Sequence, residues 1–265
     1  MLEQQVSVST ATLLTLIRRH GAEPHTVLSS TAVWEDERAR RAAEERADGE
    51  LARLGLYGHG AVHPGLLATV AVIARPAVEY YAWINGGIEN QPVNYTVLAG
   101  AGAGEAFVLV RNSDSQVVAL GSVHPAELLD NFVAQLPRLG PGRGRALRVP
   151  KSALAGGAKR REFDGENFAV MSNGRRDPAG TEVAEMRRIL GLPRLGGGSL
   201  YVASRGRGGR RERAEHPVNY IDTAEGRWLT EEVPGSGEPV IAFHPASPNL
   251  LVDRLRTAQG RLPVT

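Results

Sequence analysis

The pattern of apolar and polar positions divides this chain into segments with strand periodicity and segments with helix periodicity. Residues 78–84, 93–99, 106–111 and 116–121 are rich in β-branched and aromatic residues, and turns containing Gly, Asn and Asp separate them. They predict four strands, and because the connections are too short for parallel crossovers, an antiparallel sheet. Further strands are predicted over residues 6–9, 146–149, 199–204, 218–223, 226–233 and 239–243.

Helical spacing and end signals predict the remaining elements. Ser9 or Thr10 can cap a helix that Gly21 ends, and Pro64 can begin another. Ser247 and Pro248 occupy the N-cap and first position of a closing helix. Helices are predicted over residues 10–19, 35–54, 64–75, 125–136, 151–154, 181–190 and 249–261.

The order of these elements repeats, and so do parts of the sequence. Residues 117–132 align without a gap with residues 240–255, and residues 6–13 resemble residues 147–154. Pro-Val-Asn-Tyr occurs at residues 92–95 and again at 217–220. The repeats follow the same order, which indicates an internal duplication whose halves complete one core.

The duplication predicts a single domain made of two half-repeats. The N-terminal half would cover residues 6–137 and the C-terminal half residues 146–265. Residues 138–145 between them are rich in Gly and Pro and predict a linker.

Composition excludes several classes of protein. The 265 residues are 42% hydrophobic and 23% charged, which is enough apolar material for a sizeable core. Without cysteine there is no disulfide, thiol catalysis or thiolate metal site. The N-terminus lacks a signal-peptide pattern, and no apolar run approaches the length of about 18 residues typical of a membrane helix. We therefore expect a cytoplasmic protein that is not inserted in a membrane.

None of the usual catalytic patterns is present. Residues 100–104 are rich in Gly but lie between two strands, which favours a hairpin turn over a nucleotide-binding loop. His59 and His63 have helical spacing, but the glycines and proline around them disfavour a helix and hence a metal pair. Asp222 is expected to bond nearby backbone amides in a turn. The sequence predicts no enzyme activity and no cofactor or metal.

Residues 205–213 form the one basic cluster. They resemble an RGG-type nucleic-acid segment, but they lack interleaved aromatic residues and lie between two predicted strands. A long, solvated hairpin loop is the favoured interpretation. The alternative hypothesis is a nucleic-acid-binding or regulatory protein that uses this loop.

Residues 218–229 contain Asp222-Thr223 and Gly226-Arg227, which together resemble the D-T-x-x-G-R strand-turn-strand of the EspG family of type VII (ESX) secretion-associated proteins. Residues 54–76, residues 6–16 and Pro137 also match this family's pattern. The resemblance implies an α+β fold with quasi-two-fold duplication, in which two α-helical bundles flank a central antiparallel β-sheet. It also implies a cytosolic chaperone that binds the apolar tip of a PE–PPE heterodimer or of a PPE-like secreted helical protein.

The resemblance further implies where the partner binds. In the family, contacts come from the loop between the second and third strands and from the C-terminal helical bundle. Nucleic acid is not expected as a partner, and a monomer or weak homodimer is expected. The implied contact residues are Asn85, Gly86, Gly87, Ile88, Glu89, Asn90 and Gln91 in the loop, and Phe163, Phe168, Val170, Met171, Met186 and Ile189 in the bundle.

Overall fold

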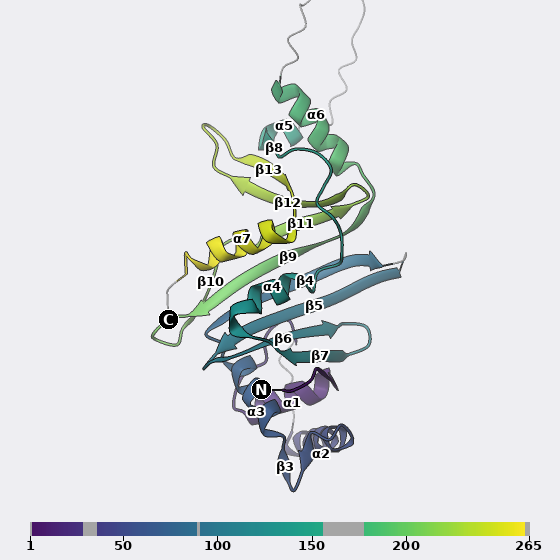
Figure 1. The fold of residues 1–265 in the computed structure, drawn as a ribbon, viewed down its shortest axis with the longest axis vertical. Helices are drawn as coiled ribbons and strands as arrows, with labels where there is room; N and C mark the ends of the chain where they lie inside the picture. The colour runs from purple at the N-terminus through teal and green to yellow at the C-terminus, as the bar shows by residue number, and fades with distance from the viewer. Residues whose placement is uncertain (1, 29–35, 89–90, 156–177, 263–265) are drawn as a thin grey trace, which may run out of the picture. The chain divides into compact units, whose positions relative to one another are not determined.

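The computed structural model describes residues 2–28, 36–88, 91–155 and 178–262 (Figure 1). They divide into two compact units. The first unit takes residues 1–138, 196–218 and 248–265, and the second takes residues 139–195 and 219–247. The chain therefore returns from the second unit to the first, and the units differ from the two predicted half-repeats.

The first unit is built on an antiparallel sheet, as the short connections predicted. A short strand, β10, extends it by pairing with β9. In spatial order the strands are β1 (Val6–Ser9), β7 (Val117–Ser122), β6 (Glu105–Asn112), β5 (Gln91–Gly102), β4 (Val78–Ile88) and β9 (Arg194–Arg205), with β10 at Arg211–Arg213.

Helices cover both faces of this sheet. On one face α1 and α3 pack against the strands and α2 packs on α1, around a core that includes Leu98 and Leu109. On the other face α4 packs on β5 and β6, where Phe132 contacts Tyr80, and α7 contacts α4. The bounds are α1 (Thr10–Arg19), α2 (Glu37–Arg53), α3 (Pro64–Ala74), α4 (Leu128–Val133) and α7 (Pro248–Gln259).

The second unit contains four antiparallel strands and has its own core. The spatial order is β11 (Val218–Thr223), β12 (Gly226–Val233), β13 (Val240–Pro245) and β8 (Leu147–Pro150). Helices α5 (Lys151–Ala155) and α6 (Pro178–Leu190) pack on β8. The core residues are Leu147, Val149, Met186, Ile189, Trp228 and Phe243.

Strand register confirms the internal duplication. Val6 of β1 pairs with Leu120 of β7, and the residues aligned with them by sequence, Leu147 and Phe243, pair with each other in β8 and β13. The next three pairs along each ladder also correspond. Each half therefore closes its first strand onto its last strand in the same register.

The repeated Pro-Val-Asn-Tyr, in contrast, is not structurally equivalent. Gly102 and Glu105 close the β5–β6 hairpin, and Thr223 and Gly226 close the corresponding β11–β12 hairpin. Counted from these closing pairs, Tyr220 corresponds to Ala99 and not to Tyr95. This echo in the sequence was therefore a coincidence.

Several predicted elements need correction. Residues 55–62, which connect two predicted helices and for which no strand was predicted, contain a small hairpin of β2 (Tyr57–Gly58) and β3 (Ala61–Val62). The helix predicted over residues 125–136 is a 3-10 turn (Pro125–Glu127) followed by the short α4. By contrast, Ser9 caps α1 as predicted, because its Oγ accepts a hydrogen bond from the Thr12 amide at 3.1 Å.

Candidate partner-binding surface

The predicted contact loop is largely a β-ribbon. Asn85, Gly86, Gly87 and Ile88 belong to β4 and pair with residues 94 to 91 of β5, while Glu89 and Asn90 lie outside the described residues. Gln91 begins β5. The prediction of a seven-residue loop was wrong. Glycine usually weakens strands, but in β4 it allows the backbone of a neighbouring strand to come unusually close.

That close approach is on the other side of β4. Asn85 pairs with Gly197 and Gly86 pairs with Gly196 of β9. A Cβ atom on Gly196 would lie 2.6 Å from the Asn85 carbonyl oxygen and 2.7 Å from the Gly86 Cα. Glycines on both strands thus leave a platform of backbone with few side chains, next to the exposed Asn85.

An aromatic cluster borders this platform on the same face of β4. Trp83 precedes Asn85 by two residues, so both side chains point to one face, and Trp83 is 39% exposed. Its ring meets Tyr81 and Tyr201 edge-on, at centroid distances of 5.5 Å and 5.3 Å. Tyr81 and Tyr201 stack at 5.1 Å. These contacts hold the ring of Trp83 in place. A partner that covers its exposed apolar surface would therefore cost little side-chain entropy.

In the second unit, α6 does not present the predicted residues. Met186 and Ile189 have no exposed surface and belong to the core around Trp228 and Phe243. They form the buried stripe of an amphipathic helix, so their assignment as contact residues was wrong. Among the described residues of this unit, the exposed large apolar side chains are Leu190, at 39%, and Leu195, at 44%. Phe163, Phe168, Val170 and Met171 lie outside the described residues.

The Asp-Thr-x-x-Gly-Arg hairpin has a structural explanation. Asp222 and Arg227 face each other across β11 and β12, and the carboxylate accepts two hydrogen bonds from the guanidinium, at 2.7 Å and 2.8 Å. Each residue is only 4% exposed. The guanidinium carbon also lies 4.4 Å from the centroid of the Tyr220 ring. Asp222 therefore neutralises a buried arginine, whereas the sequence suggested bonds to local amides.

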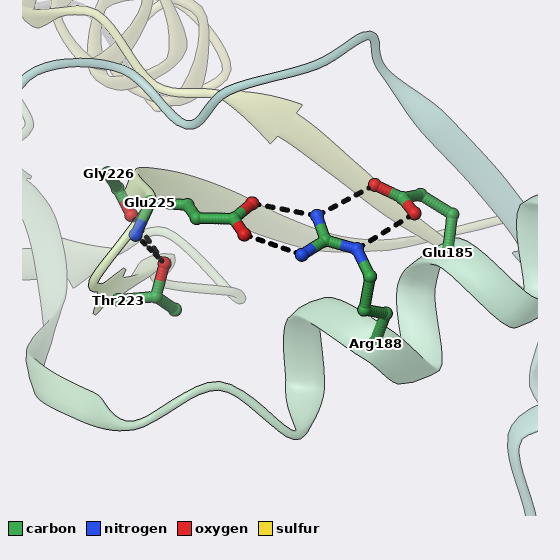
Figure 2. Close-up of polar contacts among 5 residues, drawn as sticks. All are labelled: Glu185, Arg188, Thr223, Glu225 and Gly226. Atoms are coloured by element: carbon green, nitrogen blue, oxygen red, sulfur yellow. Dashed lines mark hydrogen bonds and ion pairs between the residues drawn. The ribbon is translucent and has the colours of Figure 1, made fainter.

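The turn between the two strands is fixed by its own residues. Thr223 Oγ1 accepts a hydrogen bond from the Glu225 amide at 3.2 Å and donates one to the Gly226 carbonyl at 3.0 Å (Figure 2). Gly226 has φ +112°, and a Cβ there would lie 2.5 Å from the Pro141 carbonyl oxygen. Only glycine suits both conditions.

The predicted linker packs against this hairpin. The Arg227 amide donates to the Gly140 carbonyl at 2.8 Å, and the Gly142 amide donates to the Arg227 carbonyl at 2.7 Å. A Cβ on Gly142 would lie 2.2 Å from the Trp228 ring, so glycine is required for the contact. Residues 140–142 are thus hydrogen-bonded to the hairpin, with Gly142 buried against Trp228, and do not act as a free linker.

An exposed arginine joins α6 to the same turn. Arg188 donates to Glu225 at 2.5 Å and 2.7 Å and to Glu185 at 3.0 Å and 2.9 Å (Figure 2). These hydrogen bonds lower the pKa of both carboxyl groups. An open groove of ≈ 470 Å³, lined partly by Arg188, Thr181 and Trp228, lies beside this contact.

Comparison with known proteins decides the family. The family model described as the EspG family matches residues 9–257, nearly the whole chain. The chain belongs to the EspG family. A solved structure titled as the Mycobacterium tuberculosis type VII secretion system chaperone EspG5 in complex with PE25-PPE41 dimer is similar, with a TM-score of 0.61 at 18% identity. The match covers 98% of this chain and 97% of that chain, and shows the shared fold. A search among proteins of curated function gives no match.

The EspG-family chain contains no clustered metal ligands within its described ranges. Across the same ranges, no helix has both the length and the apolar composition needed to span a membrane. The candidate site of this chain is the backbone platform of β4 and β9 together with the exposed side chain of Trp83. Trp83 was not among the contact residues predicted from the sequence. It precedes Asn85 by two residues, so strand alternation alone could have placed both side chains on one face.

Proposed function

We propose that this EspG-family protein is a cytoplasmic type VII (ESX) secretion chaperone. It binds the apolar tip of a PE–PPE heterodimer, or of a PPE-like helical hairpin, and keeps its partner soluble and competent for export. The observation that carries this proposal is the family match over residues 9–257. It is supported by the shared fold with EspG5, which was solved as a complex with a PE25-PPE41 dimer.

The surface chemistry agrees with this role. A helical tip with exposed apolar side chains tends to aggregate, and a chaperone must cover it reversibly. In the first unit, Trp83 and the end of the β4–β5 hairpin offer apolar area and open backbone. In the second unit, Leu190 and Leu195 offer exposed apolar side chains. Binding of this kind needs no catalytic residue or cofactor.

Co-expression with a helical PE–PPE-like pair encoded near the gene tests the proposal. Size-exclusion chromatography should give a stable complex, and the pair should remain soluble only beside this protein. If the pair precipitates equally with and without this protein, the chaperone role is wrong.

A variant of the β4–β5 hairpin tests its part in binding. Replacing residues 88–91 by Asn-Gly removes the last pair, Ile88 with Gln91, and closes the shorter hairpin with a two-residue turn. We expect weaker binding with an unchanged fold. Substituting Ala103→Asn in the β5–β6 turn is the matched control, because Ala103 already has φ +52°, which asparagine tolerates. If both variants bind the helical pair with equal affinity, the β4–β5 tip is not part of the interface.

A further inference from the structure

The basic cluster of residues 205–213 is partly ordered strand and not the solvated loop expected from its composition. Arg211 and Arg213 belong to β10, where they pair with Arg205 and Ala203 of β9. Residues 206–210 alone form the connection. Arg211 and Arg213 therefore have defined positions on β10, but their side chains make different contacts.

Arg211 anchors the hairpin to the sheet. Its Nε donates to the Glu79 carboxylate, which is 3% exposed, and His25 Nε2 lies 3.5 Å from the same carboxylate oxygen. Burial alone would raise the pKa of Glu79, but the hydrogen bond from His25 and the charge of Arg211 outweigh it and keep the pKa below its usual value. The charge of Arg211 is thus neutralised by Glu79 within the first unit.

Arg213 is held differently, and its charge is not neutralised by any residue that the structure describes. Its guanidinium carbon lies 5.4 Å from the centroid of the Tyr201 ring. The side chain is exposed, and it forms no ion pair or hydrogen bond with any residue that the structure describes. An arginine that lies over an aromatic ring can still direct N–H donors toward a partner, and the planar fork of these donors matches a carboxylate in a bidentate geometry.

Trp83 and Arg213 both contact Tyr201. The Trp83 ring centroid lies 5.3 Å and the Arg213 guanidinium carbon 5.4 Å from the centroid of the Tyr201 ring, so these two groups are at most about 11 Å apart. Two turns of a helix span about 11 Å. A helix that presents a carboxylate and, at most two turns away, an apolar side chain would therefore meet Arg213 and Trp83 together.

We propose that Arg213 and Trp83 form a two-point contact that selects the helical partner by charge. Arg213 binds a carboxylate on the partner helix, and Trp83 covers an apolar side chain on the same face of that helix. Charge complementarity supports an acidic partner, because residues 205–213 contain five arginines and one glutamate. This proposal rests on the proposed chaperone function and adds a determinant of partner choice.

A single-stranded nucleic acid fits this surface less well. Stacked bases need open aromatic faces. Tyr81 stacks on Tyr201 at an interplanar angle of 7°, and Arg213 also lies over the Tyr201 ring. Trp83 is then the one aromatic ring of this cluster with a large exposed fraction.

The test compares Arg213→Ala with Arg207→Ala. Arg207 carries the same charge in the connecting turn, and it has no cation–π contact with an aromatic ring of the described residues. Isothermal titration with the co-encoded helical pair should give a Kd raised about tenfold or more for Arg213→Ala, the loss typical of a charged hydrogen bond. Arg207→Ala should stay within about twofold, as expected for a rim charge. Arg213→Lys keeps the charge but loses the fork, and should recover only part of the affinity.

Each outcome is informative. Thermal melts first confirm that all variants fold like the wild type. If the pair binds the wild type and both alanine variants equally, this proposal is wrong while the chaperone function stands. If the pair does not bind the wild type, both are wrong. A second titration, with an oligothymidylate, tests nucleic acid as the partner. If the oligothymidylate binds the wild type and Arg207→Ala but not Arg213→Ala, the surface is a nucleic-acid site and this proposal is wrong.

Discussion

The buried ion pair between Asp222 and Arg227 gives the sharpest prediction about stability. Substituting Asp222→Ala would leave the Arg227 guanidinium, which is 4% exposed, without the carboxylate that accepts two of its hydrogen bonds. Breaking a buried pair by removing one partner costs about 3–5 kcal/mol, because an uncompensated charge stays buried. That is a large part of the roughly 5–15 kcal/mol that holds a typical domain folded.

Urea unfolding followed by circular dichroism measures this cost. With a denaturant slope of about 1–3 kcal/mol per molar urea, the midpoint should fall by at least about 1 M. Asp253→Ala is a matched control, because Asp253 faces Arg256 at 3.8 Å with both side chains about two-thirds exposed. An exposed pair of this kind contributes about 0–1 kcal/mol, so the control midpoint should hardly move.

A double substitution separates the charge from the shape of the site. Combining Asp222→Ala with Arg227→Met removes both charges and should recover much of the lost stability, because apolar replacements of buried pairs are often neutral. If Asp222→Ala costs no more than Asp253→Ala, the carboxylate does not compensate Arg227, and the explanation given for the family motif is wrong.

Three further predictions concern the fold. Gly226→Ala should destabilise by more than about 2 kcal/mol, from positive φ plus a backbone clash, whereas Gly104→Ala, with φ +82° and open space, should cost about 1–2 kcal/mol in the same urea assay. Burial would raise the pKa of Glu50, but hydrogen bonds from Ser9 and Thr12 outweigh it and lower the pKa. The stability that Glu50 contributes is present above the unfolded pKa and lost as pH falls through the folded pKa, so Glu50→Gln should flatten the acid side of a Tm–pH curve. Met186→Ala should lower the free energy of unfolding by about 2–5 kcal/mol without changing the Kd for the helical pair. Leu190→Ala should leave the free energy of unfolding within about 0.5 kcal/mol of the wild type, and thermal melts and titrations check both variants.

The sequence predicted best where local signals decide the structure. Strands β11 and β12 lie where the pattern placed them, since a short turn with Gly226 separates two runs rich in apolar residues. The capped start of α1 and the proline that begins α3 were also predicted correctly. In each case the deciding interactions lie within a few residues along the chain.

The errors arose where distant segments decide. Gly86 and Gly87 suggested a loop, but Gly196, far along the chain, lets the β4 backbone pass at close range. Arg213 looked solvated because Tyr201, over whose ring it lies, belongs to a different strand. Asp222 could not be paired with Arg227 before the hairpin register was known. Such pairings follow from tertiary structure and have no local signal.

The residues that mark the family and the residues proposed to bind the partner have different tasks. Asp222, Gly226 and Arg227 are buried or sterically confined, and they hold the hairpin and residues 140–142 together. Trp83 and Arg213 are exposed and can change without opening a core. A backbone platform can bind a helical tip whatever its side chains, so a few exposed residues beside it suffice to choose among partners. Substitutions at Trp83 and Arg213 are therefore expected to change partner preference without loss of the fold.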